Sequence, residues 1–168
     1  ARRDTMAAVL LAAAIAAAED PDQVLAVMPS DHLIRDAGAL QEAIRTAAGS
    51  VRAAGIAVIG VAPTGPSTAY GYIKPGAGAA DGTSEVLRFV EKPDAARAAA
   101  LIAEGCLWNA GMFAFRAGWL LEAMGAVEPE AVALVRKAVA EMVTDLGMYV
   151  PGASFAEVRA ISFDHGFM

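Results

Sequence analysis

Residues 23–32 read QVLAVMPSDH, a short apolar run that ends in proline and polar side chains. A second continuous apolar run, IAVIGV at 56–61, follows a helical pattern at 36–54 that ends at Gly55. Apolar runs without alternation are typical of strands buried on both faces of a parallel sheet. Helices that alternate with such strands predict right-handed βαβ units. The sequence therefore predicts an α/β fold, with a mostly parallel sheet flanked by helices.

The rest of the chain extends this pattern in both directions. Residues 5–18 are rich in alanine and predict a helix that is apolar on nearly all sides, and therefore buried. Residues 63–71 predict a loop, and the glycine-rich residues 76–82 predict a hairpin tip. Further strands are predicted at 71–75, 85–91, 107–116 and 158–163, and further helices at 94–104 and, as a pair, between 118 and 141.

Composition and charge exclude several classes of protein. The chain has 168 residues, 57% of them hydrophobic and 19% charged, which fits one folded domain and not a disordered chain. A net charge of −6 without a basic stripe argues against nucleic-acid binding. The apolar run at 6–18 is too short to cross a membrane. Cys106 is the only cysteine, so we expect it to be buried, in a protein of the reducing cytoplasm.

Two aspartates follow predicted strands, and they are the candidate metal ligands. Asp31 follows the run at 23–28, and Asp164 follows the predicted strand at 158–163. Ligands of open α/β sheets collect at the carboxyl ends of strands. Mg²⁺ takes one or two carboxylates together with water and phosphate oxygens, so the two side chains could share one ion. The alternative for either aspartate is a turn or a helix cap.

The tripeptide Glu91-Lys92-Pro93 is a candidate for binding a phosphorylated sugar. Its carboxylate can accept hydrogen bonds from sugar hydroxyls, and its ammonium can bind a phosphate as a compact point charge. The alternative is a solvated charge pair at the end of a strand.

Two other segments pair a glycine with a polar or aromatic side chain. Asn109 offers a donor and an acceptor, which suits a vicinal diol, and Gly111 allows a ligand to approach the backbone. Gly71 follows Tyr70 in the same way, joining backbone room to an aromatic platform. The alternative for this second segment is a hairpin with ordinary aromatic packing.

The segments PSDH, TAYGYI, FVEKP, WNAGMFAF and SFD occur in this order along the chain. Together they closely resemble mannose-1-phosphate guanylyltransferases, the GDP-mannose pyrophosphorylases of the nucleotidyltransferase superfamily. Arg3-Asp4-Thr5 resembles that family's Arg-Asn-Thr segment, with Asp4 in place of asparagine. The resemblance covers nearly the whole chain. It implies a Rossmann-like catalytic domain, of which residues 1–168 are the central and sugar-binding portion, and an enzyme that transfers GMP from GTP to mannose 1-phosphate.

The resemblance also implies a role for each candidate residue. Asp31 and Asp164 would bind the catalytic Mg²⁺, and Lys92 would hold the sugar phosphate. The implied substrate contacts are Arg3 and Thr5 near the nucleotide, and Tyr70, Gly71, Glu91, Asn109 and Gly111 at the sugar.

The departures from the family pattern lead to further expectations. The family's glycine-rich triphosphate loop has no counterpart here, and His165-Gly166 replaces the usual small aliphatic pair after the second aspartate. We therefore expect a fold that is incomplete at both ends, inactive alone, and prone to aggregate or form homo-oligomers through an exposed sheet edge. Two alternatives stay open: transfer from UTP or dTTP to glucose 1-phosphate, and a non-catalytic remnant that binds sugar nucleotides.

Overall fold

The computed structural model describes residues 3–167, and these form two compact units. Unit 1 comprises residues 3–25 and 115–167, and unit 2 comprises residues 26–114. Both units combine the helices and strands of an α/β protein, as the sequence predicted.

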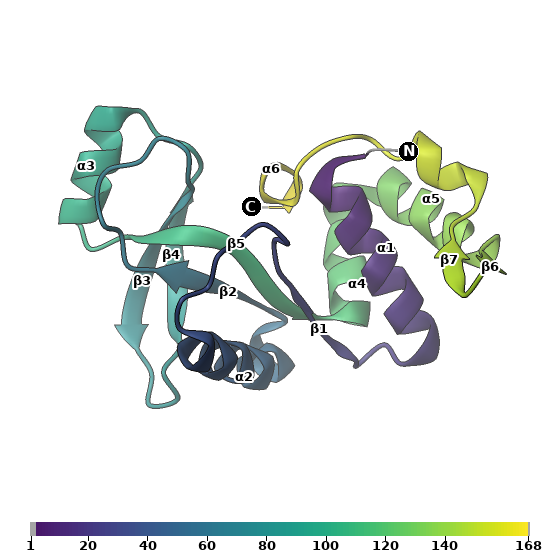
Figure 1. Ribbon diagram of the computed structural model, residues 1–168, viewed down its shortest axis with the longest axis horizontal. Helices are drawn as coiled ribbons and strands as arrows, with labels where there is room; N and C mark the ends of the chain where they lie inside the picture. Colours follow the sequence, from purple (N-terminus) through teal and green to yellow (C-terminus); the bar gives the residue numbers. More distant parts are fainter. Residues whose placement is uncertain (1–2, 168) are drawn as a thin grey trace. The chain divides into compact units, whose positions relative to one another are not determined.

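Three helices form most of unit 1. α1 (Asp4–Glu19) runs beside α4 (Ala117–Val127) and α5 (Pro129–Ala140), as Figure 1 shows. α1 buries side chains along most of its length, which confirms the apolar helix predicted at 5–18. Pro129 occupies the first turn of α5, where its missing N–H costs no helical hydrogen bond. The side chains of this unit with 0% exposure are Met6, Ala7, Leu10, Ala13, Phe115, Ala117, Leu120, Met124, Val135 and Ala138.

The C-terminal part of unit 1 differs from the prediction. Residues 158–162 form no strand, and they connect a 3₁₀ helix, η1 (Ala153–Glu157), to a short helix, α6 (Phe163–Phe167). The predicted strand at 158–163 is therefore wrong. The backbone of this segment bonds to the start of α1 instead, because Met6 N–H donates to the Ile161 carbonyl at 3.2 Å. The sequence analysis also missed a small hairpin of β6 (Val143–Asp145) and β7 (Met148–Val150).

Unit 2 holds most of a five-stranded sheet. The sheet has the order β1-β5-β3-β4, and β2 also pairs with β5. Its strands are β1 (Val24–Val27), β2 (Ile56–Val61), β3 (Tyr72–Gly78), β4 (Ser84–Val90) and β5 (Leu107–Arg116). β1 and β2 are mostly half-buried, so the predicted burial on both faces is not found.

The strands that carry the candidate site are antiparallel. β3 pairs antiparallel with β4, with Tyr72 opposite Val90, and antiparallel with β5, with Tyr72 opposite Trp108. The prediction of a mostly parallel sheet is wrong for these two pairs. The short turn between β3 and β4 accounts for the first of them, because a parallel pair needs a long crossover. The hairpin tip predicted at 76–82 lies at this turn.

The two helices of unit 2 begin and end at the predicted signals. α2 (Ala37–Ala54) is capped by Asp36, whose carboxylate accepts from Ala39 N–H at 2.9 Å, and it ends at Gly55 with φ of 84°. α3 (Ala95–Ala103) is capped in the same way by Asp94. α3 packs on β3 through a core of Tyr72, Ala98, Leu101 and Cys106. The burial of Cys106, 3% exposed, confirms the prediction for the single thiol.

Candidate functional site

Three of the predicted sugar contacts lie together where β3, β4 and β5 are adjacent. Tyr72 of β3 pairs with Val90 of β4 and with Trp108 of β5. Gly71, Glu91 and Asn109 are the next residues along from these three, so the pairing places them side by side. Asn109 N–H donates to the Gly71 carbonyl at 2.8 Å. A Cβ atom on residue 71 would lie 2.6 Å from Glu91 Oε2 and 3.3 Å from Asn109 Cβ. Only glycine fits here without displacing the carboxylate.

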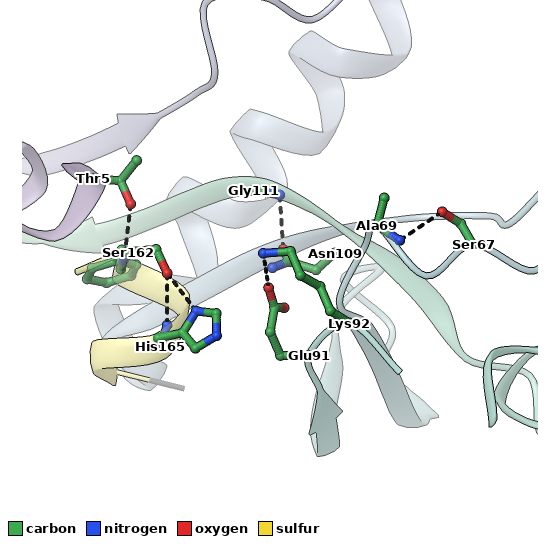
Figure 2. Close-up of polar contacts among 10 residues, drawn as sticks. Thr5, Ser67, Ala69, Glu91, Lys92, Asn109, Gly111, Ser162 and His165 are labelled. Carbon is green, nitrogen blue, oxygen red and sulfur yellow. Dashed lines mark hydrogen bonds and ion pairs between the residues drawn. The ribbon is translucent and has the colours of Figure 1, made fainter. Parts of the chain in front are cut away.

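Glu91 has one carboxylate oxygen in an ion pair and one without a partner. Lys92 Nζ lies 3.0 Å from Glu91 Oε1, as Figure 2 shows. Glu91 Oε2 is buried and accepts no hydrogen bond from residues 3–167. Leaving a charged oxygen buried and unsatisfied is costly, so this oxygen can accept a hydrogen bond from a donor outside residues 3–167.

Lys92 adopts a backbone conformation that is rare for a residue with a side chain. Its φ is 42°, in the left-handed region, and Pro93 follows directly. The proline that follows restricts the Lys92 backbone further, by disfavouring the right-handed helical region. Its side chain is 55% exposed, so the ammonium is accessible to an anion.

Asn109 is buried, and it fixes the glycine that follows two residues later. Asn109 Oδ1 accepts from Gly111 N–H at 3.0 Å, and Gly111 has a φ of 64° (Figure 2). A Cβ atom on Gly111 would contact Pro29 Cγ at 3.5 Å. The PSDH segment, which contains Asp31, therefore begins against this glycine. Asp31 itself is exposed, in a turn after β1.

Tyr70 lies against an aromatic side chain that the sequence analysis did not single out. The rings of Tyr70 and Trp108 have centroids 4.9 Å apart and are tilted by 52°. Trp108 Nε1 is buried and makes no hydrogen bond to residues 3–167. The position of Trp108 directly before Asn109 was the available signal.

The three remaining candidate residues belong to unit 1. Thr5 Oγ1 accepts from Phe163 N–H at 2.8 Å (Figure 2), and an Arg3 guanidinium N–H donates to the Ala156 carbonyl. Asp164 lies in the first turn of α6 and is half-buried. Arg3 and Thr5 thus hold the segment that leads to Asp164. Their predicted contact with a nucleotide stays a prediction, as does the meeting of Asp164 with Asp31 at one ion.

Ser162 and His165 shape the turn around Asp164. Ser162 Oγ lies 2.7 Å from His165 Nδ1, and the His165 backbone N–H donates to the same hydroxyl at 3.4 Å. Gly166 N–H donates to the Ser162 carbonyl at 3.1 Å. His165 and Gly166, which depart from the family pattern, are accommodated in a single helical turn.

The donor set suits a metal that binds together with substrate. No group of three or more His, Cys, Asp or Glu side chains within residues 3–167 is arranged to hold a metal ion. Asp31 and Asp164 each offer hard carboxylate oxygens, and Mg²⁺ commonly takes one or two such ligands with substrate phosphates. Each carboxylate by itself suits such an ion, and the sharing of one ion by the two residues stays a prediction.

A hollow elsewhere in unit 1 contains none of the candidate residues. A cavity of about 450 Å³ is lined by Ala14, Ala17, Ala18, Pro21, Gly118, Leu121, Arg136, Val139 and Ala140. Its lining is largely apolar and offers a single charged group.

No helix among residues 3–167 has the length and apolar character needed to cross a bilayer.

Comparisons with known proteins show which family and which solved fold the chain resembles. A protein-family model described as nucleotidyl transferase matches residues 1–153. The xanthan biosynthesis protein XanB of Xanthomonas campestris pv. campestris strain B100 is 44% identical over 137 residues, which are 81% of this chain. Mannose-1-phosphate guanylyltransferase of Escherichia coli K12 is 39% identical over 174 residues, covering 99% of this chain.

A solved structure has the same fold. The crystal structure described as mannose-1-phosphate geranyltransferase from Thermus thermophilus matches with a TM-score of 0.87 and 33% identity, covering 100% of this chain and 48% of that one. The chain spans 29% of the length of XanB and 36% of the length of the E. coli relative.

Proposed function

Because this chain belongs to the nucleotidyl transferase family, we propose that it contributes to an enzyme that transfers GMP from GTP to mannose 1-phosphate. Relatives named mannose-1-phosphate guanylyltransferase support this choice of substrates. Such substrates and a free, buried Cys106 suit a cytoplasmic enzyme.

The cluster of Gly71, Glu91 and Asn109 is the observation that carries the proposal. Glu91 Oε2 is buried without a donor among residues 3–167, and it lies where a side chain on Gly71 would clash. A sugar hydroxyl supplies the donor that this oxygen lacks. Asn109, with its amide beside the same glycine, can bind a neighbouring hydroxyl.

Lys92 is the group that would bind the sugar phosphate. In the transfer, a phosphate oxygen of the sugar attacks the α-phosphorus of GTP and forms a new P–O bond. The bond to the oxygen that bridges to the β-phosphorus breaks, and pyrophosphate leaves. The protein contributes positioning and charge stabilisation to such a reaction. The exposed ammonium of Lys92, next to the sugar cluster, is suited to holding the attacking phosphate.

Asp31 and Asp164 are the residues that would hold Mg²⁺. When bound, this ion neutralises charge on the phosphate oxygens. Changing Asp31 to Asn keeps the size of the side chain and removes its charge. We expect turnover to fall about 100-fold or more, by analogy with the loss of one charge-stabilising group at an active site, and the Mg²⁺ concentration for half-maximal rate to rise. Unchanged turnover and Mg²⁺ dependence would remove Asp31 from the metal site.

A substrate panel tests the proposed reaction. The natural gene product that contains these residues is incubated with GTP, UTP, dTTP and ATP, each with mannose 1-phosphate or glucose 1-phosphate, and pyrophosphate release is measured. We expect the highest kcat/KM for GTP with mannose 1-phosphate. A preference for UTP or dTTP with glucose 1-phosphate would contradict the proposed substrates. Binding of GDP-mannose without turnover of any pair would favour the non-catalytic remnant.

A further inference from the structure

The loop before the cluster of Gly71, Glu91 and Asn109 is anchored by the buried hydroxyl of Tyr72. Tyr72 is fully buried in β3, and its hydroxyl bonds twice to the backbone of Ser67. The hydroxyl accepts from Ser67 N–H at 2.9 Å and donates to the Ser67 carbonyl at 3.0 Å. One oxygen therefore satisfies both backbone groups of a loop residue, which leaves that residue little freedom to move.

A second contact stiffens the same loop from within. Ser67 Oγ accepts from Ala69 N–H at 3.2 Å and closes a small turn (Figure 2). Serine side chains commonly order a chain in this way. The ordered turn leads directly into Tyr70 and Gly71.

Gly71 is held from its other side by the sheet. Asn109 N–H donates to the Gly71 carbonyl at 2.8 Å. The segment from Ser67 to Gly71 is thus fixed at both ends, by the Tyr72 hydroxyl and by the β5 backbone. Glu91 Oε2 lies where a Cβ atom on Gly71 would clash, so a shift of this segment would change the space beside the Glu91 carboxylate.

We propose that the Tyr72 hydroxyl is a positioning group for hexose 1-phosphate binding, a role that rests on the proposed function. The hydroxyl holds residues 67–70 in one conformation before substrate arrives, and so it sets the place of Gly71 and of the Tyr70 ring. A site that is already ordered loses less conformational entropy on binding. The phenol faces the α3 core with Trp108, so it acts through the loop and does not touch the sugar.

Tyr72→Phe in the natural gene product tests this role, because it removes the hydroxyl and keeps the buried ring. We expect the KM for mannose 1-phosphate to rise about fivefold to tenfold, as expected for the loss of one or two net hydrogen bonds. The KM for GTP and kcat stay within about twofold of wild type, since residues 67–70 affect the binding of the sugar phosphate alone. Ser67→Ala, which removes only the bond to Ala69, raises the same KM by a smaller factor. Tyr149→Phe, at an exposed tyrosine of β7, is the matched control and leaves all three constants unchanged.

Amide hydrogen exchange gives a readout that does not depend on activity. We expect faster exchange at Ser67 and Ala69 in Tyr72→Phe, with the exchange of α2 unchanged. An unchanged KM for the sugar phosphate would overturn the role, and so would a parallel change in both KM values and kcat. A wild-type protein that turns over no hexose 1-phosphate contradicts the proposed function instead. In that case unchanged exchange at Ser67 and Ala69 would overturn the positioning role as well.

Discussion

The candidate residues of the two units are held in place in different ways. In unit 2, Gly71, Glu91 and Asn109 come together because three adjacent strands align them at one level. In unit 1, Asp164 follows a segment without regular structure that is fastened to the start of α1, including a bond between residues 158 positions apart. A strand register brings several side chains together at once, whereas each hydrogen bond to the start of α1 positions only one short segment. We therefore expect substitutions in the cluster of Gly71, Glu91 and Asn109 to weaken use of the sugar phosphate selectively. Substitutions that remove the hydrogen bonds to the start of α1 should lower the free energy of unfolding first.

Gly71→Ala should have the largest effect. The new Cβ would lie 2.6 Å from Glu91 Oε2 and 2.8 Å from Phe89 Cζ, so the carboxylate has to move. We expect kcat/KM for mannose 1-phosphate to fall about 100-fold, since small misplacements at an active site cost about that much. Steady-state kinetics of the natural gene product provide the measurement.

Gly49→Ala is the matched control for this change. Gly49 lies within α2 of the same unit, and a Cβ there meets nothing within 4 Å. We expect unchanged kinetics and a gain of about 0.5–1 kcal/mol in the free energy of unfolding. Equal activity losses in both variants would show that the loss does not come from the cluster of Gly71, Glu91 and Asn109.

Thr5→Val should have an intermediate effect, in unit 1. Valine keeps the shape of threonine but cannot accept the bond from Phe163 N–H. A part-buried donor left without a partner lowers the free energy of unfolding by about 1–3 kcal/mol. Denaturant unfolding measures this loss, and Thr144→Val in the exposed β6 serves as control. If Thr5 instead contacts only the nucleotide, the KM for GTP will rise while stability stays unchanged.

Glu104→Gln should have the smallest effect and a pH dependence of known sign. Arg88 bonds to the Glu104 carboxylate and lowers its pKa below the ordinary value of 4.5, and Arg97 adds to this at 3.2 Å. Because the folded-state pKa is the lower one, the stabilisation is present above 4.5 and is lost as the pH falls through the folded-state pKa. The difference in melting temperature between wild type and variant should be largest at about pH 6 and should shrink steadily as the pH falls below 4.5. A difference that does not shrink as the pH falls would contradict this origin.

The elements of unit 2 were largely predictable because local signals agreed with one another. Asp36, Gly55 and Asp94 mark helix ends by capping chemistry that needs no tertiary information. The antiparallel pairing of β3 with β4 agrees with the hairpin tip predicted at 76–82, because a short turn cannot join parallel strands. The antiparallel pairing of β3 with β5 was missed, since an apolar strand pattern carries no direction.

The C-terminal part of unit 1 was the least predictable. Residues 158–163 carry the apolar pattern of a strand, yet their backbone partners lie at the start of α1. No local pattern reports a partner so far away in the chain. The β6–β7 hairpin was missed because its turn is Leu146-Gly147, and leucine is an unusual choice for a positive φ, here 49°.

Part of the candidate site was also predicted from the sequence, and part of it was missed. The grouping of Gly71, Glu91 and Asn109 followed from recognising an ordered set of motifs, and the strand register places these residues together. Tyr72 and Trp108, which support the cluster from the α3 side, were missed because their apolar rings look like ordinary core residues in the sequence. Only their polar atoms, a doubly bonded hydroxyl and a buried indole N–H without a partner among residues 3–167, set them apart.

A direct binding measurement with the sugar phosphate tests most directly whether Glu91 Oε2 accepts a hydrogen bond from a sugar hydroxyl. Calorimetry with mannose 1-phosphate, without nucleotide, compares wild type with Glu91→Gln and with Glu85→Gln, an exposed glutamate of β4. We predict that Glu91→Gln weakens binding about tenfold or more, as for the loss of a hydrogen bond to a charged group, while Glu85→Gln binds like wild type. Equal affinity of wild type and Glu91→Gln would contradict the account.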